Sequence, residues 1–424
     1  MRAFISMVVI SLVLSVGLAS AQTRITFVGW GNESRYHELF DADFKAFPQL
    51  GEKYEMRYVM APQDTDAVAK LRLALVSGVD IPDIMEFNYS RTIEFLQQGG
   101  IFADVTSYIE PYKDNVIPEV LKLVSYKDRY YGFPTQIKTK LWFYRKDLCD
   151  AAGVDPSHVK TTDDFIAAGK KLRAKFPNAY IWNLGPQTAG YLPIEILSGN
   201  GARFSDEKGN YIVASDPGVR RAFVDLKRIV DSGVVSRIND WSPDWQKGFA
   251  DGTLASQLCA KWLTDFLPGY AGKDQSGKWA VAQWPAIGGA DGGSEAGGGL
   301  FVVLDKSANK AAAADITSKL WLTRESFVLI RKTPTFGAWS PILKDLAADP
   351  KFSGNDYFGP SFAPQAAEAL RKFKLFPYSP KFDQEIAILI GYLDQYLNGA
   401  KSLDEALSGA EKDMKNQLSN AFQS

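Results

Sequence analysis

The sequence has few of the side chains that carry most metal and nucleophilic chemistry. Its 424 residues include two cysteines and two histidines, His37 and His158. Neither histidine belongs to a metal-binding spacing such as HExxH, and no partner motif for a catalytic triad accompanies them. Cys149 and Cys259 leave two interpretations open: a disulfide in an oxidising compartment, or two small buried apolar side chains. We therefore expect neither a metal nor a cofactor.

An excess of charge of one sign is also missing. The chain has 48 basic and 49 acidic residues, for a net charge of −1. A nucleic-acid-binding surface normally leaves a basic signature, so this balance predicts no nucleic-acid partner. Hydrophobic residues make up 46% of the chain, which excludes a largely disordered protein.

Long apolar runs are confined to the N-terminus. Residues 3–18 are almost wholly apolar, follow the basic Arg2, and precede small residues at positions 19–21. This run is shorter than the roughly 20 residues that cross a bilayer, and the pattern is typical of a secretory signal peptide. We expect residues 1–21 to be removed near Ala21 and the mature protein to be exported to the periplasm.

The length of the chain predicts two lobes. At 46.9 kDa it exceeds the size at which a single hydrophobic core stops growing. Short β-rich runs alternate with helical patterns of 10–15 residues, which indicates a parallel-rich α/β sheet. Ligands of such sheets bind beyond the carboxyl ends of the strands. The first strands end in a polar and aromatic set: Trp30, Asn32, Glu33, Asn88, Ser90 and Arg91.

Residues 130–147 predict a crossing from one lobe to the other. A β-rich run reaches Pro134, which fits poorly inside a central strand because it lacks an N–H. The run resumes through residues 141–144, and polar side chains including Lys138 lie between the two parts. We expect these polar side chains to face the region where the lobes meet.

The second half of the chain predicts two further crossings. Residues 286–299 are dominated by glycine, which favours a flexible connector, and residues 300–304 read as a strand that returns to the first lobe. Residues 332–337 predict a third crossing. Three tryptophans stand at strand ends or loop starts beside polar residues: Trp182, Trp241 and Trp262.

Several short motifs resemble one known family. Residues 131–147, with Tyr144-Arg145-Lys146-Asp147-Leu148, resemble the crossover strand of periplasmic solute-binding proteins of the maltose-binding class. Residues 77–84, with Pro82-Asp83-Ile84, and residues 252–262, ending in Trp262, resemble other segments of the same family. Residues 297–310 and 403–407 follow in the family's order, so the resemblance covers nearly the whole mature chain.

The resemblance implies a carbohydrate-type extracellular solute-binding protein of an ABC importer. Its fold would be the two-lobed α/β periplasmic-binding-protein fold (type II), with hinge strands between the lobes. The implied N-terminal lobe is 22–134 plus 298–335, and the C-terminal lobe is 135–297 plus 336–424. The implied partners are a small carbohydrate and membrane permease subunits, and the protein is expected to be a monomer without enzymatic activity.

The resemblance also assigns binding positions. Those that match the family's positions are Trp30, Asn32, Glu33, Asn88, Ser90, Arg91, Lys138 and Trp262. To these we add Gly298 at the second crossing, and Trp182 and Trp241 for their position at strand ends or loop starts. Lys138 departs from the carboxylate or amide that is usual near the crossover.

Two alternatives remain open on the sequence. Arg91, Lys138, Lys140 and Lys261 could all approach the cleft, which would suit an anionic solute such as an acidic or sulfonated sugar or a glycerol phosphodiester. An aromatic cleft would serve a secreted carbohydrate-active enzyme equally well, because catalytic carboxylates need proximity in space and not in sequence. For a neutral sugar, aromatic faces and planar polar side chains are the expected partners.

Overall fold

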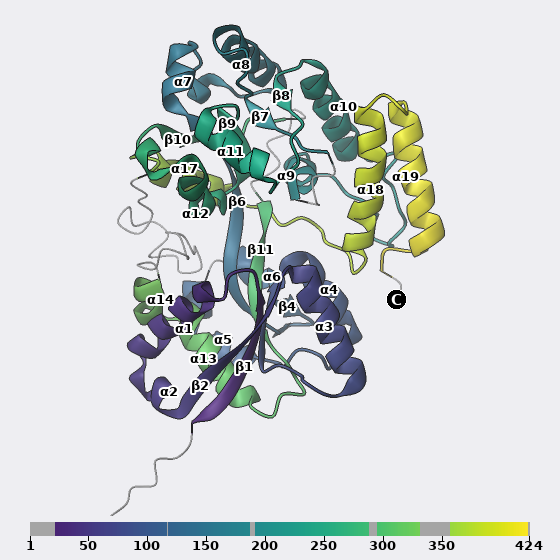
Figure 1. Ribbon diagram of the computed structural model, residues 1–424. Helices are drawn as coiled ribbons and strands as arrows, with labels where there is room; N and C mark the ends of the chain where they lie inside the picture. The colour runs from purple at the N-terminus through teal and green to yellow at the C-terminus, as the bar shows by residue number, and fades with distance from the viewer. Residues whose placement is uncertain (1–21, 117, 187–190, 288–294, 331–356, 423–424) are drawn as a thin grey trace, which may run out of the picture.

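The computed structural model describes residues 22–116, 118–186, 191–287, 295–330 and 357–422. The predicted signal peptide, residues 1–21, and the predicted third crossing, residues 332–337, lie outside these ranges. The described chain forms two lobes joined by long strands (Figure 1). Within the described ranges, no helix combines the length and the apolar character that crossing a membrane requires.

One mixed sheet runs through both lobes. Its strands are β1 (Thr23–Trp30), β2 (Tyr54–Ala61), β3 (Ile84–Asn88), β6 (Phe133–Arg145), β9 (Ser256–Ala260), β10 (Trp279–Ala282) and β11 (Glu295–Val303). Their order is β10-β6-β11-β3-β1-β2, with β9 also paired to β6. Short strands outside it are β4 (Ser125–Tyr126), β5 (Arg129–Tyr130), β7 (Trp182–Asn183) and β8 (Val235–Ser236). β1 pairs in parallel with β2 and β3, as the alternation of strands and helices predicts.

β6 belongs to both lobes. Its first half pairs with β11 in the first lobe, whereas residues 140–144 pair with β9 in the second. The strand runs unbroken through Pro134, so the expected interruption there is wrong. The ladder instead shifts register opposite Pro134, between Gly299 and Leu300 of β11. A register shift accommodates the N–H that proline cannot donate.

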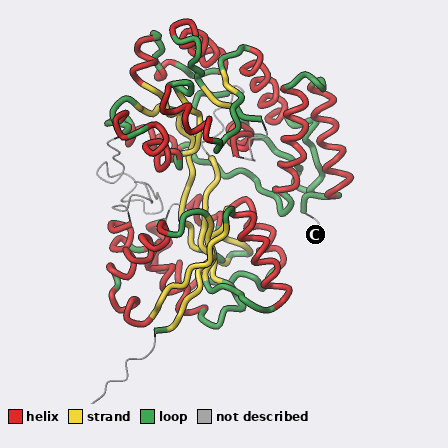
Figure 2. Tube along the Cα trace, viewed as in Figure 1, coloured by secondary structure: helices red, strands yellow, loops and turns green. Residues whose placement is uncertain are grey.

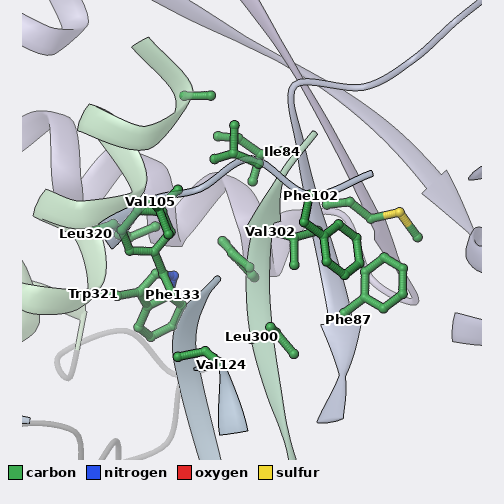
Figure 3. Packing of buried hydrophobic residues seen from close by; sticks show 14 of the residues in the cluster. Ile84, Phe87, Phe102, Val105, Val124, Phe133, Leu300, Val302, Leu320 and Trp321 are labelled. Carbon is green, nitrogen blue, oxygen red and sulfur yellow. The ribbon is translucent and has the colours of Figure 1, made fainter. Parts of the chain in front are cut away.

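Helices cover both faces of the first-lobe sheet (Figure 2). They are α1 (Ser34–Ala46), α2 (Pro48–Lys53), α3 (Asp64–Ser77), α4 (Tyr89–Gln98), α5 (Thr106–Ile109), α6 (Pro118–Leu123), α13 (Lys310–Leu322) and α14 (Arg324–Ile330), with the 3-10 turn η1 (Glu110–Asn115). Phe133 packs with Trp321 on one side of the sheet, and Phe87 packs with Phe102 on the other (Figure 3). Residues 300–304 complete this core, so the chain returns to the first lobe through β11.

The second lobe contains the remaining helices. They are α7 (Lys146–Ala151), α8 (Thr162–Lys175), α9 (Tyr191–Gly199), α10 (Pro217–Asp231), α11 (Pro243–Asp251), α12 (Leu263–Ala271), α17 (Phe362–Arg371), α18 (Phe382–Leu397) and α19 (Leu403–Leu418), with η2 (Pro156–His158) and η3 (Lys273–Gln275). Two hydrophobic clusters, one around Trp142 and one around Trp245, form its core. We retain the predicted lobe boundaries as a proposal.

Local sequence explains where several of these helices begin and end. α3 starts at a capping box between Gln63 and Asp66 and stops at Gly78, whose φ of 71° is left-handed. α10 starts with Asp216 accepting a hydrogen bond from the Val219 N–H, and Pro217 occupies its first turn. These caps set where the two helices begin and where α3 ends.

The glycine run and the cysteines lie in ordered, buried surroundings where the structure describes them. Gly297, Gly298 and Gly299 lie inside β11, so this end of the run is strand and not a flexible connector; residues 288–294 lie outside the described residues. Cys149 and Cys259 are both buried and free. Burial raises the pKa of the Cys149 thiol to about 12 and also raises that of Cys259.

Candidate ligand-binding site between the lobes

Glu86 is a buried carboxylate at the centre of the polar group that the first lobe contributes to the candidate site. It lies in β3, is 4% exposed, and accepts hydrogen bonds from Arg35 Nη2 at 3.0 and 3.3 Å. The Tyr36 hydroxyl also donates to Glu86. Desolvation opposes the charge on Arg35, but the attraction of Glu86, with help from Tyr36 and Asp265, outweighs it and raises the pKa of Arg35. Arg35 is therefore a fixed, fully charged donor.

Arg91 forms ion pairs that link the two lobes. Its guanidinium pairs with Asp64 of its own lobe and with Asp383, at the start of α18 in the other lobe. The Asn88 amide also donates to Asp64. Figure 1 shows the lower end of α18 beside α4, in agreement with this contact. Arg91 thus links three segments that are far apart in the sequence.

Lys138 occupies the crossing strand between these groups. Desolvation lowers its pKa, while the nearby Glu86, Asp64 and Glu195 act in the opposite direction and Arg35 adds to the lowering. These neighbours come from both lobes. Lys138 therefore stands at the junction, with carboxylates on both sides.

The second lobe contributes Asp265 on α12. Asp265 is accessible to solvent, yet desolvation raises its pKa to about 6, against the opposing effects of Lys261, Thr264 and Arg35. A carboxylate that is accessible but largely surrounded by protein is expected in a concave region. Because Arg35 belongs to the first lobe, the attraction between Arg35 and Asp265 acts across the interlobe region.

Aromatic rings lie next to Asp265. Trp262 precedes α12, and the Trp241 ring stacks on it with centroids 5.0 Å apart and planes at 19°. Phe266 meets both rings edge-on, with both centroid distances at 5.7 Å. Trp241 also contacts the Trp245 ring at 5.4 Å, yet it remains 51% exposed, so about half of the residue is open to solvent.

Buried polar side chains lie behind the second lobe's part of the candidate site. Lys140 Nζ donates to the Glu195 carbonyl at 2.8 Å, and desolvation raises the pKa of the Glu195 carboxyl well above its usual value. Burial also raises the pKa of Asp240, to about 6, although the Asn183 amide donates to it at 2.6 Å. The Asn183 side chain also bonds with the backbone of Ile238, so Asn183 fixes the loop that carries Trp241.

Comparison with known proteins now decides the family. Residues 42–358 match the family described as bacterial extracellular solute-binding protein. The chain belongs to this family. No three histidine, cysteine, aspartate or glutamate side chains are grouped as metal ligands in the part of this solute-binding protein that the structure describes.

Curated relatives of this solute-binding protein have sugar-related names. It is 25% identical over 364 residues to the arabinooligosaccharide-binding protein of Halalkalibacterium halodurans, covering 81% of this chain and 78% of the relative. It is 28% identical over 306 residues to the lactose-binding protein of Rhizobium radiobacter, covering 69% of each. Both matches extend across most of each protein.

Solved structures confirm the fold. An ABC-transporter-associated binding protein from B. animalis subsp. lactis Bl-04, solved with beta-1,6-galactobiose, superposes with a TM-score of 0.77 and 22% identity. The match covers 95% of this chain and 100% of the other. The MalE sugar-binding protein of Xanthomonas citri gives a TM-score of 0.77 at 18% identity, covering 94% and 98%. The predicted two-lobed periplasmic-binding-protein fold is confirmed.

The structure brings only some of the predicted binding residues of this solute-binding protein together. Asn88, Arg91, Lys138, Trp241 and Trp262 take part in the contacts described above. Their assignment to a ligand stays a prediction, because these contacts are all within the protein.

The side chains of the loop after β1 make their contacts with residues close by in the sequence. Asn32 accepts hydrogen bonds from the Ser34 N–H and hydroxyl, and Glu33 pairs with His37 at 3.2 Å. Both predicted residues are exposed. Trp30 is half-buried, and its backbone bonds with the Tyr36 hydroxyl. This places Trp30 beside the Glu86 group.

Three predicted residues have other surroundings. The Trp182 ring is fully buried and packs edge-on against Phe165 and Trp284 in the second-lobe core, so the structure does not bring it to the interlobe surface. Ser90 is half-buried in the first turn of α4. Gly298 is buried in β11 opposite Ile137. Trp182 stands in a short strand as expected, but its ring points into the hydrophobic core of the second lobe.

Sequence reasoning missed four contributors: Arg35, Asp64, Glu86 and Asp265. Glu86 carried a signal, because a lone carboxylate inside the apolar run of residues 84–87 must find a buried partner. Asp64, Arg35 and Asp265 lie on helix ends where acidic and basic residues are ordinary. Only the folded arrangement distinguishes them from surface charges.

Proposed function

We propose that this solute-binding protein captures a neutral sugar or oligosaccharide between its lobes and delivers it to the permease subunits of an ABC importer. The observation that carries the proposal is the stacked pair of Trp241 and Trp262 beside Asp265, a carboxylate that is attracted to Arg35 of the other lobe. Aromatic faces suit the apolar faces of sugar rings, and charged donors and acceptors suit their hydroxyl groups. The relatives' names point to the same class of ligand.

Charge balance favours a neutral ligand over an anionic one. The cations that could recognise an anion have carboxylates nearby: Arg35 has Glu86, Arg91 has Asp64 and Asp383, Lys138 has Glu86, Asp64 and Glu195, and Lys261 has Asp265. Lys140 donates to the Glu195 carbonyl. An anion would have to compete with these carboxylates, whereas hydroxyl groups can join the network without adding charge.

Binding is proposed to leave the sugar unchanged. The family is one of binding proteins, and closure of two lobes about hinge strands is a known way to enclose a ligand. Export to the periplasm, removal of residues 1–21 and a monomeric state belong to the same proposal. The lobe surfaces would then contact the permease.

Titration calorimetry with a panel of neutral and acidic sugars tests the proposal. We expect micromolar or tighter binding of at least one neutral member, which corresponds to about 8 kcal/mol. Chromatography of the sugar after long incubation should recover it intact. Absence of binding to every sugar, preference for acidic sugars, or turnover would each contradict the proposal.

A further inference from the structure

A groove in the first lobe lies between the sheet and α3, and its volume is about 600 Å³. Its floor is a row of apolar side chains on three neighbouring strands: Val59 of β2 pairs with Val28 of β1, and Val28 pairs with Met85 of β3. Leu71 and Ala74 of α3 line the opposite wall. A groove of this volume with apolar walls has the dimensions of a small-molecule site.

The groove is separate from the candidate sugar site. It extends to the C-terminal end of α3 and the loop before β3, through Ser77 and Val79. This loop enters β3 at its first residue, whereas Asn88 is the last residue of β3 and Arg91 follows it in α4. None of the residues that line the groove belongs to the interlobe contacts described above. The two sites therefore use different side chains.

The groove leaves large apolar side chains in contact with water. Leu73 of α3 is 69% exposed and Val79 is 62% exposed, and both line the groove. Val76, which lies outside the lining, is more exposed still. No other large hydrophobic side chain in the described ranges reaches the exposed fraction of these three. Apolar side chains gathered on a surface are characteristic of binding sites, and a ligand with an apolar chain would gain free energy by covering them.

Two cations lie at the β2 end of the groove, where the sheet ends. Arg57 precedes Val59 by two residues and so shares its face of β2. Lys70 Nζ of α3 donates to the Met60 carbonyl of β2 at 3.3 Å. Among the described residues, neither cation has a carboxylate within ion-pair distance. Asp80, the only carboxylate among the described lining residues, belongs to the loop before β3, two strands away from β2.

We propose that this groove binds a free amphiphile with an apolar chain and one anionic head group, such as a fatty acid. The head group lies between Arg57 and Lys70, which donate charge-assisted hydrogen bonds to it. The chain crosses the apolar floor from Val59 toward Met85 and covers Leu73. Charge complementarity at one end and uncovered apolar side chains along the wall favour this occupant, and a groove between a helix and a sheet admits a single chain. The inference does not rest on the proposed sugar binding.

The test measures affinity against chain length and head-group charge. Octanoate, decanoate and dodecanoate are the probes, each below the concentration at which it forms micelles, and calorimetry gives the dissociation constants. Each two added carbons should tighten binding roughly threefold, because more of the chain leaves water. Acetate, a head group without a chain, should not bind. Decanol and decyltrimethylammonium should each bind at least about fivefold more weakly than decanoate, because neither offers an anion to the two cations.

Paired variants locate the chain and the head group. Leu73→Asp places a carboxylate on the groove wall and should weaken dodecanoate binding at least about tenfold. Val76→Asp makes the same change at an exposed position of α3 outside the lining, and should leave dodecanoate binding unaltered. Arg57→Gln should abolish the preference for decanoate over decanol, whereas Arg220→Gln, at an exposed pair in the second lobe, should keep it. The melting temperature of each variant shows whether it is folded.

Hydrogen exchange maps where the ligand binds. Dodecanoate should protect backbone amides of α3 and β2. Protection confined to the interlobe region, equal losses in Leu73→Asp and Val76→Asp, or no binding of any fatty acid would overturn the proposal. Sugar affinity should be the same in Leu73→Asp as in the wild type, so such a failure leaves the proposed sugar function standing.

Two other occupants would give different results. Flotation of the protein with phosphatidylglycerol vesicles, without binding of monomeric dodecanoate, would assign this face to a membrane surface. Light scattering that shows a dimer dissociated by Leu73→Asp, again without dodecanoate binding, would assign it to a second copy of the chain. Either result would overturn the amphiphile site.

Discussion

The two lobes bring different chemistry to the region between them. The first lobe contributes paired charges, in which Glu86 accepts from Arg35 and Asp64 pairs with Arg91. The second lobe contributes aromatic rings, and carboxyl groups such as Asp240 whose pKa is raised by desolvation. The first-lobe side chains are held in place by ion pairs, and the second-lobe rings are held by packing against one another.

The difference indicates how closure would enclose a guest. A sugar ring has hydroxyl groups at its edge and apolar patches on its faces, so it needs both kinds of surface at once. The first lobe supplies mainly paired charges, and the second supplies the stacked rings together with carboxyl groups such as Asp265. Binding strength should therefore depend on closure, which brings the polar surface against the aromatic one.

The largest effect is expected from Glu86→Gln on the first-lobe side. Arg35, whose side chain is 24% exposed, would lose its hydrogen-bonded carboxylate and keep only weaker interactions such as that with Asp265, so the free energy of unfolding should fall by roughly 2–4 kcal/mol. Urea denaturation measures this. Glu55→Gln, which breaks an exposed 3.7 Å pair with Arg24, is the control. A loss no larger than the control's would show that the Arg35 pair does not stabilise the lobe.

Trp262→Ala tests the aromatic side. It removes the ring on which Trp241 stacks, so affinity for any sugar that the wild type binds should fall by at least tenfold, or roughly 1.5–2 kcal/mol. Calorimetry measures the change. Val76→Ala, at an exposed position near the end of α3 in the first lobe, should leave affinity unaltered. Unchanged affinity in Trp262→Ala would show that the aromatic rings of the second lobe do not contribute to sugar binding.

Asp240→Asn tests the desolvated carboxylates of the second lobe. The pKa of Asp240 is about 6 in the folded protein, against 3.8 for the ordinary group. Between these values the folded state binds more protons than the unfolded state, so stability falls as pH rises from about 4 to about 6. Asp240→Asn should remove roughly 1–2 kcal/mol of this fall, allowing for partial solvent screening.

The measurement for Asp240→Asn is the free energy of unfolding of both proteins from pH 4 to 7.5. The variant should lose stability less steeply than the wild type as pH rises through this range. Asp244→Asn, in the first turn of α11, serves as the neighbouring control. Parallel curves for wild type and Asp240→Asn would mean that Asp240 does not titrate in this window.

The smallest effect is expected from Asp383→Asn, which breaks the ion pair between Arg91 and the other lobe. The Asp383 side chain is 44% exposed, and such pairs contribute little, so sugar affinity should fall about two- to fivefold. Small-angle scattering of the sugar-free variant should give a larger radius of gyration than the wild type. Asp404→Asn, which breaks the surface pair with Arg220, should not; equal radii for all three proteins would show that the pair does not hold the lobes together.

Local sequence predicted individual elements well where backbone chemistry decides them. The α3 helix stops at Gly78 because glycine tolerates a left-handed conformation there. Pro134 misled the prediction of β6, since a register shift in the partner strand absorbs the missing donor. Trp182 shows the same limit for the site: its position at a strand end is correct, yet neighbouring aromatics enclose it.

The order of residues alone determined the family, the alternation of strands and helices, and the crossing near residue 138. These follow from short-range periodicity, turn chemistry and motifs, which need no knowledge of distant contacts. Tertiary structure alone decided that Asp383 meets Arg91, 292 residues away, and that Asp265 comes near enough to Arg35 for their charges to attract. The reason is physical: the energy of a charge depends on what surrounds it, and only folding brings those surroundings together.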